Sequence, residues 1–218
     1  MKEFFKKYKH GLFFLYMFIY FPWFHYVEKT VTTDFHEIHM PLDDMIPFME
    51  IFIIPYLLWF VYVAAFAVIF FFKDAGEFTR LCIFLGVGMT VFLIVSTVYP
   101  NGHYLRPEVV SDENIFAPLI NTLYSTDTST NIMPSIHTYN SLGIGLAVIY
   151  SKHLKNMWIQ IPSFILMVLI IMSTVFLKQH SMWDLIGAFI LAFPMWLLLY
   201  SPIKIQFKEK MLSHPRSI

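Results

Sequence analysis

Two histidines stand at the edges of long apolar runs in this chain. One is His137, which follows Pro134-Ser-Ile, and the other is His180, which lies between Lys178 and Asp184. His180 and Asp184 are four residues apart, a spacing that puts both side chains on one face of a helix. A carboxylate that bonds one ring nitrogen fixes the tautomer of a histidine and leaves the other nitrogen free as a base or nucleophile. His137 is then a candidate proton donor.

Candidate anion-binding groups accompany both histidines. Arg106 has a guanidinium that grips phosphate oxygens in pairs, and Lys178 adds a point charge. Ser135 and the amides at the start of a helix form a cradle for an anion. Each feature alone is an ordinary helix start or interfacial anchor, but together they indicate phosphoryl transfer through a phosphohistidine. Charge is then stabilised without a metal or any other cofactor.

Three motifs in this chain resemble those of the type 2 phosphatidic acid phosphatase superfamily of integral membrane phosphatases and transferases. That family shows Lys-x6-Arg-Pro, Pro-Ser-Gly-His and Ser-Arg-x5-His-x3-Asp, in this order. The chain has Tyr99-x6-Arg106-Pro107, Pro134-Ser135-Ile136-His137 and Ser173-Thr174-x5-His180-x3-Asp184. The resemblance covers roughly residues 80–200, and the order of the three motifs makes it specific.

The resemblance implies a role for each matching residue. His180 corresponds to the nucleophile that takes the phosphoryl group, and Asp184 to the carboxylate that orients it. His137 corresponds to the general acid that protonates the leaving alcohol. Arg106 and Ser135 correspond to phosphate-binding positions.

Three positions depart from the family pattern. Tyr99 and Thr174 replace a lysine and an arginine, so two phosphate-binding cations are missing, and Tyr99 remains only a further candidate for the site. Lys178 restores one charge from a different position. Ile136 replaces the glycine of the second motif, and this variant resembles inositol-phosphorylceramide synthases and related bacterial proteins. Fewer cations disfavour a doubly charged monoester or a pyrophosphate and leave a diester or headgroup transfer open.

The composition is that of an integral membrane protein. Hydrophobic residues make up 57% of the 218 residues and charged residues only 14%, well below the roughly 25% of an ordinary soluble domain. The formal net charge of zero gives a nucleic-acid partner no electrostatic support. Cys82 is the sole cysteine, so no disulfide forms within the chain.

Hydropathy predicts an all-α bundle of six transmembrane helices, and the resemblance implies that the bundle is of the type 2 phosphatidic acid phosphatase kind. The chain forms a single membrane domain over 1–218, with a catalytic core over 80–200 and an extracytoplasmic loop over 99–134. The predicted spans are 11–27, 46–72, 81–98, 136–150, 158–176 and 182–200.

Details of these segments carry further expectations. The second span tilts or kinks at Pro55, a polar turn over 73–80 precedes the third, and Gly143 and Gly145 allow close helix approach. Residues 114–124 form either an interfacial helix or an unstructured loop, with equal weight.

The distribution of cations predicts the orientation. Lys29, Arg106 and Lys178 are the three of fifteen Lys and Arg residues on one side of the six-span topology. Because cytoplasmic loops carry the excess of cations, both termini are expected in the cytoplasm. Both histidine motifs then face the extracytoplasmic side.

We therefore expect a lipid phosphate phosphatase that hydrolyses a membrane lipid phosphomonoester or pyrophosphate at the extracytoplasmic face. A headgroup phosphotransferase on the same scaffold and a non-catalytic lipid-binding relative are the alternatives, and the lipid and the oligomeric state stay open. Aromatic richness and short loops favour a bacterial inner membrane. His36 and His39, near Asp34, could bind a metal, but a solvated loop is favoured.

Overall fold

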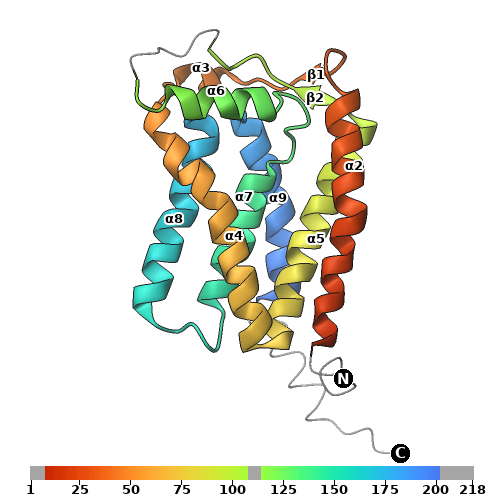
Figure 1. The fold of residues 1–218 in the computed structure, drawn as a ribbon, viewed down its shortest axis with the longest axis vertical. Coiled ribbons are helices and arrows are strands. Elements are labelled where there is room, and N and C mark those ends of the chain that lie inside the picture. Colours follow the sequence, from red (N-terminus) through yellow and green to blue (C-terminus); the bar gives the residue numbers. More distant parts are fainter. Residues whose placement is uncertain (1–7, 108–113, 202–218) are drawn as a thin grey trace, which may run out of the picture.

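The computed structural model describes residues 8–107 and 114–201. In these residues the chain is mostly helical, and its long helices run side by side (Figure 1). The elements are, in order, η1 (Lys9–Tyr16), α2 (Met17–Thr30), β1 (His36–Glu37), α3 (Pro41–Met45), η2 (Glu50–Phe52), α4 (Ile53–Lys73), α5 (Ala75–Val98), β2 (Asn101–Gly102), α6 (Ala117–Thr126), α7 (Ile136–Ile149), α8 (Met157–Phe176) and α9 (Met182–Leu199).

Four of the helices are long and apolar enough to cross a membrane. They cover 50–73, 75–98, 157–176 and 182–199, and large apolar side chains such as Phe72 and Trp158 are exposed on their surfaces or at their ends. A water-soluble protein would bury most of these side chains, whereas lipid accommodates them. The chain is therefore an all-α membrane protein. The predicted spans 11–27 and 136–150 correspond to η1 with α2 and to the shorter apolar helix α7.

The predicted polar turn over 73–80 is wrong, because α5 begins at Ala75 instead of residue 81. Asp74 is the single non-helical residue between α4 and α5. Its carboxylate accepts hydrogen bonds from the amides of Gly76 and Glu77, both at 2.8 Å, and so caps the new helix. Bonds to Glu77 and Gly76 lower the pKa of the Asp74 carboxyl. The polar residues that suggested a turn occupy the first helical turns of α5.

The second span also starts later than predicted. Residues 46–49 are not helical, η2 follows, and α4 begins at Ile53. Pro55 lies in the first turn of α4, where its missing amide costs no helical hydrogen bond, so it marks a helix start instead of a kink. Of the two alternatives for 114–124, the helix is observed as α6, which buries Ile120 and Leu123.

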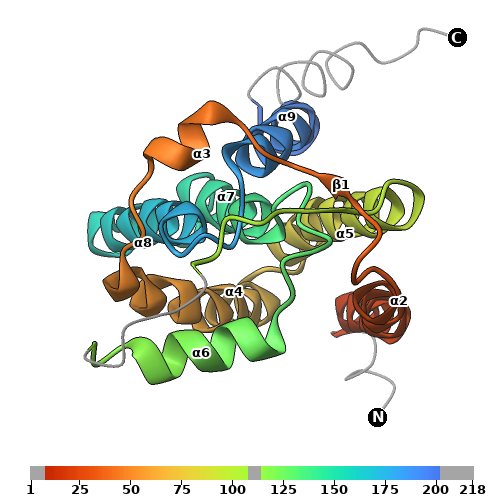
Figure 2. The same ribbon diagram turned by 90° about the horizontal axis from the view of Figure 1, so that it is seen from above.

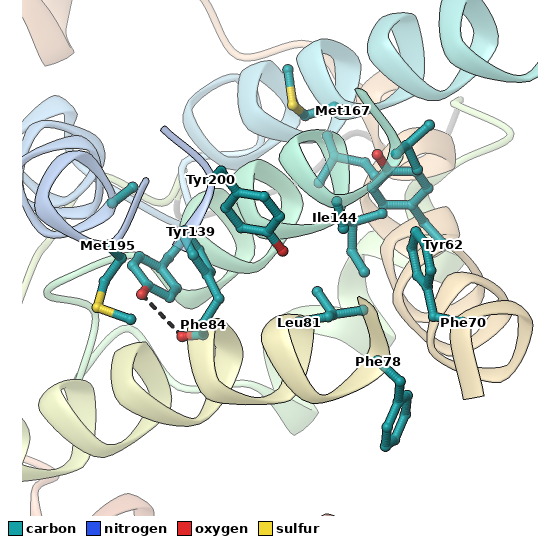
Figure 3. Close-up of a cluster of buried hydrophobic side chains, with 14 of the residues drawn as sticks. Tyr62, Phe70, Phe78, Leu81, Phe84, Tyr139, Ile144, Met167, Met195 and Tyr200 are labelled. Carbon is teal, nitrogen blue, oxygen red and sulfur yellow. Dashed lines mark hydrogen bonds between the residues drawn. The ribbon is translucent and has the colours of Figure 1, made fainter. Parts of the chain in front are cut away.

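Helix α7 lies at the centre of the bundle, between α5, α8 and α9 (Figure 2). Small residues let it approach its neighbours, as predicted: Gly143 faces Phe84 and Gly145 faces Met167, with no room for a β-carbon at either position. Tyr139 packs on Phe84 and donates a hydrogen bond from its hydroxyl to the Phe84 carbonyl, at 3.0 Å (Figure 3). This core fixes α7 and thereby the histidine at its start.

The connecting segments cross one end of the bundle, where α3, α6, β1 and β2 lie (Figure 1). Strands β1 and β2 pair in parallel, with His36 opposite Asn101 and Glu37 opposite Gly102. Gly102 also bridges Thr130, and a β-carbon there would meet the Ser129 carbonyl. The pairing ties the segment after α2 and the segment before α7 to the end of α5.

The opposite end holds both ends of the described chain. His10 bonds the Phe71 carbonyl at 3.1 Å, and Arg80 lies over the Tyr200 ring at 5.4 Å. The described residues therefore begin and end beside the α4–α5 turn, away from the histidine motifs. The cations that dominate the predicted orientation lie mostly outside the described residues, namely Lys2, Lys6, Lys7, Lys204, Lys208, Lys210 and Arg216.

Candidate active site

The turn between α8 and α9 presents His180. The amides of Gln179 and His180 both donate to the Thr174 carbonyl, at 2.9 and 3.0 Å, and this closes the turn. The Nδ1 of His180 lies 3.3 Å from the Oδ2 of Asp184, as the spacing predicted. Oδ2 also accepts the Ser181 amide at 2.8 Å, so the same carboxylate caps α9 and orients the histidine. No bond from a described residue reaches the Nε2 of His180, which is left available.

His137 lies in the first turn of α7 and faces His180, with the two ring centroids 5.7 Å apart. The rings of Tyr56 and Trp59, both from α4, pack on His137 at centroid distances of 4.6 and 4.3 Å. Its Nε2 is buried, and no described residue bonds to it. The fold thus brings together two histidines that are 43 positions apart in the sequence, as expected.

Ser135 joins the starts of the two helices that carry the histidines. Its hydroxyl accepts the Thr138 amide at 3.3 Å and caps α7, and its own amide donates to the Asp184 carbonyl at 3.1 Å. The free amides of the first turn of α7 form a partial positive charge beside His137, as at any helix start. Ser135 therefore positions the site, and its hydroxyl is engaged in capping.

Arg106 reaches the site region, but its Nη atoms are occupied. They donate to the backbone carbonyls of Asp127 at 2.8 Å and Thr128 at 2.7 Å, and to the Oε1 of Gln179 at 2.6 Å. The guanidinium lies over the Tyr124 ring at 4.6 Å. Burial lowers the pKa of Arg106, and burial likewise raises the pKa of Tyr124, to about 12. Only the buried Nε of Arg106 has no partner among the described residues.

Two other predicted candidates lie away from the histidine pair. The Lys178 ammonium donates to the backbone carbonyls of Asp43 at 2.7 Å and Ile46 at 2.5 Å, and burial lowers its pKa. Tyr99 stacks on His36 at a centroid distance of 4.2 Å. Neither lines the cavity that contains the histidines. Lys178 thus anchors the segment before α4.

The predicted loop around His36 and His39 shows no metal-ligand arrangement. His36 contacts Tyr99, whereas His39 pairs with Asp44 at 3.0 Å, and this partner raises the pKa of His39. Among the residues that the structure describes, no three His, Cys, Asp or Glu side chains converge to hold a metal ion.

Gln179 is a site residue that the sequence reading did not single out. Its Oε1 accepts from Arg106, which orients the amide and directs the Nε2 away from the guanidinium. That Nε2 is buried, has no partner in the described chain, and belongs to a side chain lining the cavity. Its position between Lys178 and His180 was the only sequence signal, and a glutamine there is not diagnostic.

His103 supports this arrangement from behind. Its Nε2 donates to the Gln179 carbonyl at 2.9 Å, and its Nδ1 accepts the Leu105 amide at 3.1 Å. These bonds select the neutral tautomer with the proton on Nε2. Burial lowers the pKa of His103 to about 4. His103 is therefore a structural histidine whose two nitrogens are both used.

Asp43 is a second unpredicted support. Its Oδ2 accepts from the Ser181 hydroxyl at 2.6 Å, and its Oδ1 accepts the Met182 amide at 2.8 Å. The carboxylate thus adds a cap to α9 from a segment almost 140 positions earlier. Nothing in the local sequence distinguishes Asp43 from its neighbour Asp44.

The two histidines and Gln179 line a cavity of about 480 Å³. Its other walls carry two carboxylates, Glu28 and Asp127, and aromatic rings from α2 and α4. A second, almost wholly apolar groove of about 790 Å³ runs along η1, α2, α4 and α5. The two spaces share the lining residues Tyr20, Phe21, Trp59, Phe60 and Ile136. The histidine cavity therefore adjoins this apolar groove, and α2 stands apart from α4 in the same bundle (Figure 2).

No family model, curated protein or solved structure matches the chain. The fold and the site together define an all-α membrane protein with a histidine–histidine–aspartate constellation at one end of its bundle.

Proposed function

We propose that the protein is a membrane enzyme that cleaves a phosphorus–oxygen bond of a lipid through a phosphohistidine intermediate. The observation that carries this proposal is the pairing of His180 with Asp184, opposite His137, at a cavity that adjoins an apolar groove. A nucleophile oriented by a carboxylate and faced by a second acid–base group is the arrangement that covalent group transfer requires.

The reaction proceeds in two steps. The Nε2 of His180 attacks phosphorus, the bond to the lipid oxygen breaks, and His137 gives its proton to that oxygen. Asp184 accepts the Nδ1 hydrogen bond and stabilises the charge that develops on the His180 ring. Water then attacks the phosphohistidine, His137 takes a proton from it, and the phosphorus–nitrogen bond breaks.

Donors around the cavity stabilise the phosphate oxygens. Gln179 offers its unpaired Nε2, Arg106 is held next to it, and the α7 N-terminus adds partial positive charge. Lys178 is tied to backbone carbonyls, so Gln179 replaces it in the proposed phosphate-binding set. Ser135 acts by holding the starts of α7 and α9 together.

The apolar groove supports a lipid as the substrate. It provides a place for an acyl chain that lies in the bilayer while the phosphate reaches the histidines. We extend this to a six-span topology with both termini in the cytoplasm and the site on the extracytoplasmic face of a bacterial inner membrane. Reporters fused after Asn121 and after Lys155 test the orientation, and reporters that give the same side contradict it.

The mechanism is tested with purified His180→Ala and His137→Ala proteins in detergent micelles that contain phosphatidic acid, undecaprenyl pyrophosphate or phospholipid diesters. We expect each variant to lose about 10²–10⁴-fold in turnover while folding as well as the wild type. His25→Ala, which removes an exposed histidine from α2, is the matched control and keeps full activity. Full activity of the His180→Ala protein on the lipid that the wild type cleaves contradicts the proposal.

A phosphotransferase on the same scaffold differs only in the second step, where an alcohol replaces water. Product analysis with and without an added alcohol acceptor separates phosphate release from headgroup transfer. A non-catalytic lipid-binding relative forms no phosphoenzyme, so brief incubation with a ³²P-labelled lipid followed by alkaline quenching distinguishes it. We expect label on the wild type and none on the His180→Ala protein.

A further inference from the structure

The cavity beside the histidines has an unusual charge for a phosphate site. Among the described residues that line it are two carboxylates, Glu28 and Asp127, and no lysine or arginine. A cavity meant for a monoester dianion or a pyrophosphate would repel its ligand with these carboxylates.

Both carboxylates are bonded to neutral groups. Glu28 accepts from the Thr128 hydroxyl at 2.7 Å and from the Nδ2 of Asn131 at 3.1 Å. Asp127 accepts from the Tyr56 hydroxyl at 3.0 Å. Within the described ranges, every ion pair closer than 4.0 Å joins a histidine to an aspartate, so neither carboxylate has a lysine or arginine partner.

Arg106 compensates for only part of this negative charge. It attracts both carboxylates electrostatically, but its Nη atoms bond backbone carbonyls and Gln179 instead. One guanidinium offsets one of two carboxylates. A charge kept in an apolar environment is costly without a counter-ion, and a cationic ligand would supply one.

A second observation points to a ligand at the same place. The Oδ1 of Asn131 is buried and has no partner among the described residues, although its side chain lines the cavity and is only 5% exposed. The Nδ2 of the same amide donates to Glu28, which directs Oδ1 away from that carboxylate. Asn131 thus leaves a hydrogen-bond acceptor beside a carboxylate, which suits an N–H donor with a positive charge.

The aromatic walls fit the same ligand. Tyr20, Phe24, Tyr56 and Trp59 line the cavity with the carboxylates. Aromatic faces attract ammonium groups, including fully methylated ones that cannot donate hydrogen bonds. The cavity therefore has an anion-accepting side at His180 and Gln179 and a cation-accepting side at Glu28.

We propose that the substrate is a phospholipid diester whose headgroup carries an ammonium group, held by Glu28, Asp127 and Asn131 while the phosphate meets His180. This inference rests on the proposed function and names its substrate class. The Nε2 of His180 bonds phosphorus, the bond to the glycerol oxygen breaks, and His137 protonates that oxygen. Diacylglycerol leaves along the apolar groove, and water or an alcohol then takes the headgroup phosphate from His180.

The test compares three lipids with identical acyl chains in mixed micelles: phosphatidylethanolamine, phosphatidylcholine and phosphatidylglycerol. We expect the wild type to prefer the ethanolamine lipid over the glycerol lipid by about tenfold or more in kcat/KM, as a charged hydrogen bond allows. The choline lipid tells whether N–H donation contributes beyond charge, and its parity with ethanolamine also supports an ammonium site. Equal turnover of the glycerol and ethanolamine lipids overturns the proposal.

Two variants localise the preference. Glu28→Gln keeps the size of the side chain and should lower kcat/KM for the ethanolamine lipid about tenfold while changing the glycerol lipid by less than twofold. Glu37→Gln, which changes an exposed glutamate at the same end of the bundle, should alter neither. An equal loss on all three lipids in Glu28→Gln reveals a structural role and overturns the assignment.

Binding separates this inference from the proposed reaction. The His180→Ala protein, which cannot form the phosphoenzyme, is titrated with the same three micelles against a labelled phospholipid. A preference for the ammonium lipids that Glu28→Gln abolishes supports the headgroup site even if no lipid is turned over, in which case the proposed reaction fails alone. Turnover of lipids without any such binding preference overturns the headgroup site and leaves the reaction standing.

Discussion

Two buried carboxylates, one at each end of the helix bundle, are bonded differently. At the end that holds the α4–α5 turn, Glu77 accepts from the Ser151 hydroxyl and from the Lys152 amide, both at 2.7 Å, and lines neither the cavity nor the groove. At the histidine end, Asp184 leaves its Oδ1 unpaired among the described residues, and its partner His180 faces the cavity. The first carboxylate closes a loop, and the second orients the proposed nucleophile.

The difference between Glu77 and Asp184 offers a way to distinguish structural polar groups from candidate functional ones in a membrane bundle. Most buried polar groups that serve only the fold have their partners within the chain. The groups proposed to serve a ligand combine an unpaired buried atom with a place in the cavity wall, as Gln179 and His137 do. His103, at the histidine end, has both ring nitrogens bonded and is therefore a structural group like Glu77.

The largest expected effect comes from Asp184→Asn. The amide still accepts from Ser181 but no longer fixes the His180 tautomer, so turnover should fall about 10²–10⁴-fold. The thermal unfolding midpoint in detergent should change little. The matched control is Asp44→Asn, which alters an exposed carboxylate on α3. Wild-type turnover by the Asp184→Asn protein would place Asp184 with the structural carboxylates.

Glu77→Ala should lower the stability of the protein and leave its turnover unchanged. Removing the carboxylate leaves the Ser151 hydroxyl and the Lys152 amide without their acceptor, at a cost of about 2–3 kcal/mol in the free energy of unfolding. Turnover per folded molecule should stay at the wild-type value. Denaturant titration in detergent and an assay on the folded fraction check both, with Glu37→Ala as the exposed control. A selective loss of turnover would contradict the division between the ends.

Acidification tests the structural role of His103. Because its pKa is about 4 in the folded state, against a usual value of 6.5, the unfolded chain binds more protons between these values. The contribution of neutral His103 to the free energy of unfolding is therefore fully present above about pH 6.5. It is lost as the pH drops, by about 2 kcal/mol at pH 5. The His103→Asn protein should lose this part of the slope, whereas His25→Ala should keep it. Identical slopes in all three proteins would argue against a buried neutral His103.

Asp43→Asn should have the smallest effect. The amide keeps one acceptor for α9 and loses the charge that strengthens the bonds to Ser181 and Met182, which should lower stability by about 1 kcal/mol. Turnover should fall less than twofold, because His180 and Asp184 keep their own contact. A large, stability-independent loss of turnover would move Asp43 from the support of α9 to the reactive site.

The sequence by itself determined the helical, membrane-embedded class and the pairing of His180 with Asp184. Both are local properties, since apolar runs and a four-residue spacing are encoded in neighbouring residues. The last three helices agree with their predicted spans to within one residue at each end. The start of α5 differs from its predicted position. Capping by Asp74 and the bonds of Glu77 to a distant loop stabilise a helix there despite the polar residues of its first turns.

Only the tertiary structure decided which polar residues line the cavity. Arg106 and Lys178 have the right chemistry for a phosphate, yet their donors go to backbone carbonyls of segments far along the chain. Gln179 and Glu28 reach the cavity because α2, α4 and the α8–α9 turn converge there. The partners of a long, flexible side chain depend on packing between distant segments, and residue type and spacing do not encode that packing.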